Sequence, residues 1–245
     1  MTGVLVAVGL VALAVAVSRA NSLGVERELA VASLRAAVQL AVVGAVVALV
    51  FEHVGLAWAF VAVMLAAASA TSGRRLAGLP QATARAGGAI AAGAATALVP
   101  LLVSGAFSTG PRELVPVAGI LIGGAMAATS VTGRRVRDRA GEDLTGIETR
   151  LLLGAGVAEA LAPAARGAAT TALIPILDQT KSVGLVTLPG TFVGLILGGA
   201  TPAEAARVQL TVLLALLAVE VVAAVVAARL AVSALRAPGE RVRLP

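Results

Sequence analysis

Long runs of apolar residues constrain this chain more than any other feature. Seven such runs are candidate membrane spans, and only the last of them contains a charged side chain, Glu220. They cover residues 4–18, 36–51, 54–72, 86–107, 114–132, 182–200 and 208–228. Because a helix crosses a bilayer with about 20 predominantly apolar residues, the pattern predicts an all-α polytopic membrane protein with about seven transmembrane helices.

The composition agrees with this class. Of the 245 residues, 59% are hydrophobic and 13% are charged, whereas soluble domains carry about 25% charged residues. We therefore expect one transmembrane domain over residues 1–245 in an inner or plasma membrane. A signal peptide is the alternative for the first run. Such a peptide has its positive charge before the apolar core, but here Arg19 follows the core, which favours a retained span.

Basic residues are distributed unevenly between the connecting segments. Counted by alternate segments, 17 of the 19 Lys and Arg residues fall on one side, and Arg112 and Arg207 fall on the other. Cytoplasmic loops carry the excess of basic residues in membrane proteins. The pattern predicts an external N-terminus and a cytoplasmic C-terminus. It also explains the net charge of +6, so we expect contact with membrane lipids and no binding of nucleic acid.

The residue types that many metal and nucleotide sites need are scarce. The absence of cysteine excludes thiolate metal sites and disulfides, and the single histidine, His53, excludes a multi-histidine metal site within one chain. A P-loop places its lysine after a glycine-rich turn, but the only lysine, Lys181, follows Thr180 without such a turn. We expect no catalytic residue, no ATP hydrolysis by this motif and no cofactor bound by this chain. The ligands of any metal remain unknown.

The predicted fifth and sixth spans contain glycine at regular spacing and proline. Gly119 and Gly123 form one GxxxG motif, and a doubled motif runs from Gly190 through Gly194 to Gly198. Small residues at this spacing let two helix backbones approach closely. The motif predicts either packing within one chain or the interface of a homodimer. Pro189 lies within the predicted sixth span, where a proline frees a carbonyl and kinks the helix.

A long polar stretch, residues 133–181, separates the fifth and sixth predicted spans. We expect it to be a cytoplasmic coupling loop, with a turn at Gly141 and a second helix capped by Thr145. That helix has a narrow apolar stripe with charged residues elsewhere on the wheel, so it lies on the membrane surface or docks into a partner. The candidate coupling residues are Leu153, Val157, Glu159, Leu161 and Arg166.

At this point one specific resemblance can be stated. Its most specific part is 172–209, with Ala172-Leu173-Ile174-Pro175, Asp178, Lys181, Val183-Gly184-Leu185-Val186, Leu188-Pro189-Gly190, Gly194, Gly199, Pro202, Ala205 and Gln209. Further matches are Arg35, Gln39, Leu40, Gly44, Pro116, Ala118-Gly119, Gly123, Met126 and Leu153-Gly154-Ala155. Over nearly the whole chain this pattern resembles the FetB-like (YbbM-like) permease family of ABC exporters. The chain departs from the family pattern at Gly124, where Asn is usual, at Thr191 and Phe192, where methionines are favoured, and at Thr170, in place of an arginine.

The resemblance implies a membrane subunit, expected to be a homodimer, that pairs with two copies of a separate ATP-binding subunit. ATP and Mg would be held by that partner. Bacterial members are linked to iron export and resistance to oxidative stress, and plant relatives to aluminium tolerance and UDP-glucose transport. The implied cargo is a metal ion, iron foremost, or a small metal complex leaving the cytoplasm. A nucleotide sugar or other anion is the alternative cargo.

Candidate pathway residues are polar or soft side chains within the predicted spans. Gln39 is costly to leave facing lipid and should point into the bundle. Met126 is either a soft metal contact or core filler. Glu220 is either a cation contact or proton relay, or a protonated carboxyl hydrogen-bonded across a dimer interface. Thr187 and Thr191 complete the set.

Candidate gating residues follow from the motif and from helical spacing. Asp178 and Lys181 are three residues apart and are predicted to form an ion pair or a helix-end anchor at the headgroups. Arg35 either snorkels to the interface or lines the pathway. The motif adds Pro189, Gly190 and Gly194.

Two alternatives of other classes stay open. An ATP-independent, proton-coupled carrier would use Glu220. A membrane-embedded scaffold or sensor would use the inner loop to bind a protein that is not an ATPase.

Overall fold

The computed structural model describes residues 2–237, 239 and 241–243. The chain divides into two compact units, Met1–Leu56 and Ala57–Pro245. The described residues form ten helices and one small antiparallel sheet. The helices are α1 (Thr2–Ala20), α2 (Glu26–Glu52), α3 (Val54–Arg75), α4 (Ala82–Val103), α5 (Pro111–Glu142), α6 (Leu144–Leu152), α7 (Val157–Ala160), α8 (Ala162–Ser182), α9 (Gly190–Leu197) and α10 (Pro202–Leu235). Strands β1 (Arg236–Ala237) and β2 (Arg241–Val242) follow α10.

Six helices of the described chain are long and apolar enough to cross a membrane, namely α1, α2, α3, α4, α5 and α10. They contain five of the seven predicted spans in full and most of a sixth, 86–107, because α4 ends at Val103. The chain is therefore an all-α, multi-pass membrane protein, and the predicted fold class is confirmed. The orientation of the helices in the membrane stays a prediction.

The first unit is a helical hairpin. Helices α1 and α2 are joined by a turn in which Gly24 adopts a positive φ of 72°, a conformation that suits glycine. The Ser18 hydroxyl donates to the Glu26 carboxylate at 2.9 Å and so ties the two helices together. The side chains of Arg35 and Gln39 are exposed on α2 within this unit.

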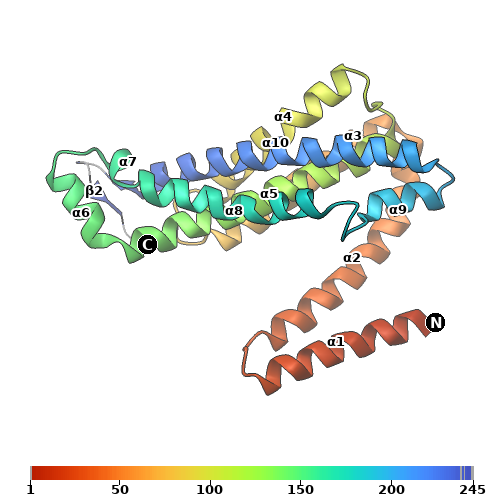
Figure 1. Cartoon of the computed structure of the whole chain (residues 1–245), viewed down its shortest axis with the longest axis horizontal. Helices are drawn as coiled ribbons and strands as arrows, with labels where there is room; N and C mark the ends of the chain where they lie inside the picture. The colour runs from red at the N-terminus through yellow and green to blue at the C-terminus, as the bar shows by residue number, and fades with distance from the viewer. Residues whose placement is uncertain (1, 238, 240, 244–245) are drawn as a thin grey trace. The chain divides into compact units, whose positions relative to one another are not determined.

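The second unit is a bundle in which α10 packs against α4, α5, α8 and α9 (Figure 1). Two glycines permit close approaches to α10. A Cβ at Gly93 of α4 would lie 2.8 Å from both the Ala223 Cβ and the Val219 carbonyl oxygen of α10. A Cβ at Gly124 of α5 would lie 2.7 Å from Leu216 Cδ2. Close helix packing therefore occurs through single glycines.

The predicted GxxxG motifs contribute less to packing within the chain. A Cβ at Gly119 would make an ordinary contact with Met64, 3.5 Å from its sulfur, and one at Gly123 would meet open space. Gly190 and Gly194 likewise face open space among the described residues. Close backbone approach through Gly190 and Gly194 is therefore not seen among the described residues, and both roles of the doubled motif, in packing within one chain and in a homodimer interface, stay predictions.

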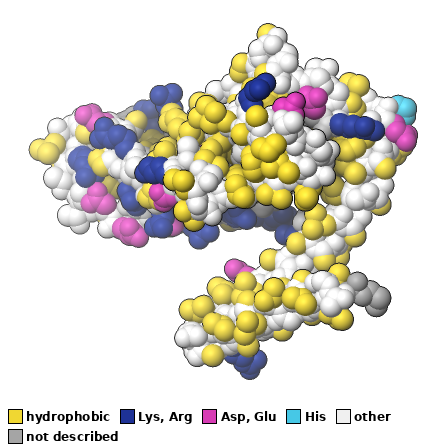
Figure 2. Space-filling model, turned by 45° about the vertical axis from the view of Figure 1, so that its right-hand side comes forward, with side chains coloured by type: hydrophobic (Ala, Val, Ile, Leu, Met, Phe, Trp, Pro, Cys, Tyr) yellow, Lys and Arg dark blue, Asp and Glu magenta, His cyan; other side chains and the backbone are white. Residues whose placement is uncertain are grey.

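The main core of the second unit lies where α5 and α10 end. It is built from α4, α5, α6, α7, α8, α10 and the turn between α3 and α4, and includes the fully buried Val136, Val157, Leu161 and Leu235. Most Lys and Arg side chains of this unit gather towards the same end in Figure 2. Because successive helices run antiparallel, this end collects basic segments that are far apart in the sequence.

The segment between α5 and α8 differs from the predicted helix with one apolar stripe. Helix α6 begins after Asp143, so Thr145 is an internal residue rather than the cap, and its carbonyl accepts from the Thr149 hydroxyl at 2.7 Å. The helix ends at Leu152 because the chain turns at Gly154, which has a φ of 93°. Leu153 is consequently 83% exposed, whereas Val157 and Leu161 are buried in the core. The predicted stripe is thus split between two environments.

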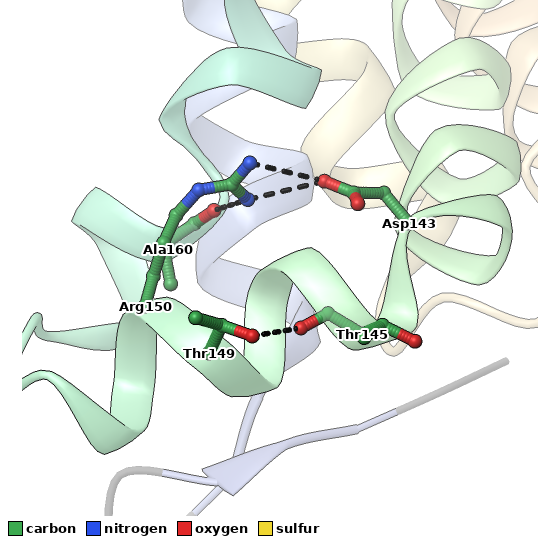
Figure 3. Close-up of polar contacts among 5 residues, drawn as sticks. All are labelled: Asp143, Thr145, Thr149, Arg150 and Ala160. Atoms are coloured by element: carbon green, nitrogen blue, oxygen red, sulfur yellow. Dashed lines mark hydrogen bonds and ion pairs between the residues drawn. The ribbon is translucent and has the colours of Figure 1, made fainter.

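Polar contacts hold this segment against the bundle end (Figure 3). The Arg150 guanidinium donates to the Asp143 carboxylate at 3.1 and 3.2 Å and to the carbonyl of Ala160 at 3.1 Å. These bonds link the beginning of α6 to the end of α7. The compact segment 143–161 is all that separates α5 from α8, so the predicted loop 133–181 is much shorter than its sequence suggests.

Candidate functional site

The most unusual feature of the bundle is an interrupted helix in the region of the predicted sixth span. That span, 182–200, is not a single helix: α8 ends at Ser182, residues 183–189 form a turn, and α9 begins at Gly190. The prediction of one continuous span is therefore wrong, although the segment does contain apolar helix.

Local chemistry explains the interruption. Gly184 has a φ of 81°, which stops the α-helix, and Pro189 is in an extended conformation as the N-cap of α9. The carbonyl of Ser182 accepts from the N–H groups of Leu185, Val186 and Thr187 at 2.9–3.3 Å. The turn is thus ordered by its own hydrogen bonds, and the proline that the sequence analysis predicted as a kink instead starts a new helix.

The break lies alongside the bundle rather than beyond its end. Both α8 and α9 pack against α10, and Figure 1 shows them following one another along it. At 1.5 Å per residue, the 21 residues of α8 extend about 31 Å and the 8 residues of α9 about 12 Å, against about 51 Å for the 34 residues of α10. Helices α8 and α9 together therefore form one interrupted segment beside α10.

A cavity of about 420 Å³ lies between the break and α10. Its walls come from Val183, Gly184, Leu188, Pro189, Phe192, Ala206, Gln209, Leu210 and Leu213. Gln209 is only 7% exposed, and its Oε1 atom has no hydrogen-bond partner among the described residues. Since buried polar atoms are nearly always hydrogen-bonded in folded proteins, an unpaired amide oxygen beside a cavity indicates a place for a ligand that donates or for a cation.

Backbone groups add to this site. The first N–H groups of a helix have no partner within the helix, and α9 begins at the break next to Pro189 and Phe192, which line the cavity. The predicted pathway residues Thr187 and Thr191 flank Pro189 but do not line the cavity. Gln209 was noted in the sequence only as part of the motif. The sequence signal that could have identified it as a site residue was a single amide side chain near the start of the apolar run 208–228.

The other predicted residues do not meet at this cavity. Asp178 and Lys181 are exposed near the end of α8, and no ion pair joins them in the part of the chain that the structure describes. By helical rise, Lys181 lies about 22 Å along α8 from Arg166. It therefore does not belong to the basic end of the bundle, where the sequence analysis had placed it.

Glu220 lies elsewhere in the bundle. It is 9% exposed on α10, and the carboxylate reaches the space that glycine leaves at position 124, where a Cβ would be 3.0 Å from Oε1. Met126 is half-buried on α5, and its carbonyl is 3.5 Å from the Ser72 hydroxyl, which in turn is 2.8 Å from that of Ser130. Gln39 and Arg35 belong to the first unit and are described only within it.

No group of three or more His, Cys, Asp and Glu side chains gathers as a metal site among the residues that the structure describes. The polar atoms at the break are instead neutral: an amide, hydroxyls and backbone groups.

The fold and the site define a multi-pass helical membrane protein with an interrupted helix beside a cavity. The chain belongs to the uncharacterised protein family UPF0014, whose model matches residues 1–235. It is 38% identical over 209 residues to the UPF0014 membrane protein STAR2 of Oryza sativa subsp. japonica, covering 84% of this chain and 73% of the relative. No solved structure matches it.

Two further relatives have names that refer to metals. The protein ALUMINUM SENSITIVE 3 of Arabidopsis thaliana is 36% identical over 205 residues, or 83% of this chain and 75% of the relative. The probable iron export permease protein FetB of Escherichia coli (strain K12) is 31% identical over 220 residues, or 89% of this chain and 85% of the relative. These matches confirm the family that the sequence resembles.

Proposed function

We propose that this chain is the membrane-spanning permease subunit of an ABC-type exporter. It moves a metal ion, iron foremost, or a small metal complex out of the cytoplasm, using ATP hydrolysed by a separate subunit. The observation that carries the proposal is the interrupted α8–α9 segment with the unpaired Gln209 oxygen beside its cavity. Transporters use discontinuous helices of this kind to expose backbone groups to a substrate at membrane depth.

The chemistry of the cavity favours a cargo bound through oxygen. Gln209 contributes an amide oxygen, and the only charged or polar side chain among the lining residues is that amide. Hard cations take oxygen ligands, and the relatives named for iron export and aluminium sensitivity concern metals of that type. The nucleotide-sugar alternative receives less support because no arginine or lysine lines this cavity.

Coupling to the ATP-binding partner is assigned to the tip of α6. Leu152 is 89% exposed and adjoins the exposed Leu153, while the remainder of the segment is fixed to the bundle by Arg150. Two exposed leucines on a rigid base suit insertion into a groove of another protein. Glu159, exposed on α7, would border that contact, whereas Val157 and Leu161 would act only as its support.

The break itself supports our proposal of a homodimer. Irregular backbone is tolerated at membrane depth only where protein or a water-filled cavity covers it, yet Leu185 is 90% exposed in the turn. A second copy of the chain is the proposed cover. Since the chain has no cysteine, Leu185→Cys can be tested for oxidative cross-linking without background. A covalent dimer is expected, with Leu10→Cys on α1 as the control. A cross-link confined to one chain, between Leu185→Cys and a second cysteine on α2, would overturn this assignment.

The central experiment is co-purification followed by transport. The tagged chain, isolated in mild detergent from its native membrane, should bring down a P-loop protein in equal amount. In vesicles holding this complex, Gln209→Leu should lower ATP-dependent iron export at least tenfold. The matched control Gln179→Leu, at an exposed position of α8, should leave it unchanged. Repeated isolation of the chain alone, or full export by Gln209→Leu, would contradict the proposal.

A proton-coupled carrier is the second candidate because Glu220 is a buried carboxyl in a membrane-spanning helix. The same vesicles separate the two hypotheses. Glu220→Gln keeps the size and hydrogen-bonding of the side chain but cannot release a proton. If ATP-driven export survives this substitution, the ABC hypothesis stands. If a pH gradient drives transport without ATP and Glu220→Gln abolishes it, the carrier hypothesis replaces it.

A further inference from the structure

A second and larger cavity, distinct from the break, lies at the basic end of the bundle. Its volume is about 560 Å³, and α7, α8, α10 and the start of β1 form its walls. The lining residues are Val157, Ala158, Ala162, Ala165, Arg166, Ala169, Val225, Ala228, Arg229, Val232, Ser233 and Arg236. None of the roles proposed above uses this cavity.

All charged side chains that line this cavity are positive. Three arginines contribute to it, Arg166 from α8, Arg229 from α10 and Arg236 from β1, and no Asp or Glu is among the lining residues. A fourth guanidinium, that of Arg85, donates to the lining residue Ser233 at 2.6 Å and to the carbonyl of Leu230 at 2.8 Å. The remaining walls are valine and alanine. The cavity therefore pairs positive charge with an apolar floor, which suits an anionic amphiphile.

The apolar floor continues away from the arginines along both helices. On α10, Leu214, Val221 and Val225 are exposed at helical spacing on the face that also carries Arg229. On α8, the face of Arg166 and Ala169 continues to Leu173 and the exposed Leu177. One leaflet of hydrocarbon is about 15 Å thick, which is about ten residues of helix. Measured from Arg229, that distance includes Val225 and Val221.

We propose that this cavity binds the headgroup of an anionic phospholipid, with its acyl chains lying in the groove between α8 and α10. The phosphate faces Arg166, Arg229 and Arg236, and the first carbons of the chains contact Val225 and Ala169. Basic pockets between transmembrane helices on the cytoplasmic side of membrane proteins bind anionic lipid headgroups in this way. The lipid would fasten α8, and so the inner half of the interrupted segment, to α10.

The alternative occupant is an acidic helix of the ATP-binding partner. Two observations favour the lipid. The arginines share the cavity with apolar side chains of α8 and of α10, and α10 is long and apolar enough to cross a membrane, which suits acyl chains. The exposed leucines proposed for the partner lie on a different element, α6. The experiment below separates the two occupants.

The test measures lipid retention by the full-length chain in mild detergent, using native mass spectrometry with phosphatidylglycerol and phosphatidylcholine as probes. The wild type should retain phosphatidylglycerol in preference. The triple variant Arg166→Gln, Arg229→Gln, Arg236→Gln should bind it about 100-fold more weakly, at about fivefold per arginine, the equivalent of about 1 kcal/mol for one basic residue at an anionic surface. Water-soluble glycerol phosphate should not compete, because it lacks the acyl chains.

Two controls keep the test specific. The matched triple variant Arg74→Gln, Arg75→Gln, Arg134→Gln removes equal charge from exposed positions outside the cavity and should retain the lipid preference. Ala169→Phe should fill the groove and release the lipid without changing charge, whereas Ala127→Phe, exposed on α5, should not. The proposal would be overturned if both triple variants lost the preference for phosphatidylglycerol equally, or if the cavity triple variant retained that preference. Loss of the ATP-binding partner with lipid retained would assign the surface to that protein instead.

Discussion

The two ends of the Ala57–Pro245 unit differ in how completely they are packed. At the basic end, side chains from six helices and from the turn after α3 close around Val136, Leu161 and Leu235, which are fully buried. At the other end, the turn after α8 leaves Leu185 and Val186 almost fully exposed, and the cavity at Gln209 is open beside them. Both ends are rich in apolar residues, so hydrophobicity alone does not decide where a core forms.

The difference separates a closely packed region from one that is incompletely covered among the described residues. At the basic end, Arg150 and Arg85 donate to backbone carbonyls, although the Nε atom of Arg85 has no hydrogen-bond partner among the described residues. The break leaves a buried amide oxygen unpaired and a turn uncovered, which costs free energy in isolation. A protein keeps such a region where substrate or another subunit completes it. Movement transmitted through α8 would thus start at the closely packed basic end of the bundle and act at the break, where packing is incomplete.

The largest expected effect contrasts the two kinds of glycine. Gly93→Val places a Cβ 2.8 Å from the Val219 carbonyl oxygen and from Ala223 Cβ, where the α10 backbone cannot easily shift. Overpacking of this kind should lower the free energy of unfolding by about 2–3 kcal/mol. The melting temperature in detergent should fall by about 4–12 °C for a unit of this size. Gly194→Val, which meets open space in the single chain, should change it little.

An equal fall in melting temperature for Gly93→Val and Gly194→Val would show that α9 is packed as tightly as α4. That result would remove the contrast between the two regions. If Gly194→Val instead leaves the melting temperature unchanged but abolishes the cross-linked dimer of Leu185→Cys, the open glycine stripe would be placed at the contact between copies.

The sequence predicts the packed part of this molecule better than the interrupted part. Six spans are predicted correctly because each is a long apolar run with at most one charged side chain, and membrane helices depend on little else. The break at 183–189 is missed because its residues are as apolar as a helix. In the sequence, Gly184 and Pro189 indicate only a kink, whereas the positive φ of Gly184 and the hydrogen bonds to the Ser182 carbonyl make a full turn. The same limit explains Gln209, whose burial beside a cavity depends on where α9 lies.

The coupling segment shows a second limit. Leu153, Val157 and Leu161 fit helical spacing, but Gly154 ends α6 between the first two of them. Periodicity over so few residues cannot distinguish one helix from two, whereas the fold exposes Leu153 and buries the other two. The Arg150–Asp143 contact was not predicted, because ion pairs along a helix are expected at spacings of three or four residues, whereas this contact joins the N-cap of α6 to a residue seven positions later.

A smaller effect is expected where α10 begins, at the incompletely packed end. The Thr201 hydroxyl accepts from the N–H of Glu204 at 3.3 Å, and the Glu204 carboxylate accepts from the N–H of Thr201 at 2.9 Å. This capping box satisfies two backbone donors that a helix start leaves unpaired. Thr201→Ala should lower the free energy of unfolding by about 1 kcal/mol. That loss should appear as a fall of about 2–4 °C in melting temperature.

Thr201→Ser, which keeps the hydroxyl, is the control and should behave like the wild type. A loss by Thr201→Ala greater than that of Gly93→Val would mean that local capping, rather than core packing, sets the stability of the bundle. The comparison drawn above would then be reversed.

The smallest effect concerns the ion pair at the packed end. Arg150 and Asp143 lie 3.1 Å apart, but their side chains are 35% and 50% exposed. Exposed pairs contribute about 0.2–1 kcal/mol because solvent screens them, so a double-mutant cycle of Arg150→Gln and Asp143→Asn should give a coupling in that range that shrinks in high salt. Arg150→Gln alone should cost more than Asp143→Asn, since it also removes the donor to the carbonyl of the buried Ala160. If the two single substitutions lowered the free energy of unfolding equally, only the charge pair would contribute to stability. A coupling of several kcal/mol would show instead that electrostatic attraction anchors α6. The apolar core would then contribute less to the stability of the basic end than its burial implies.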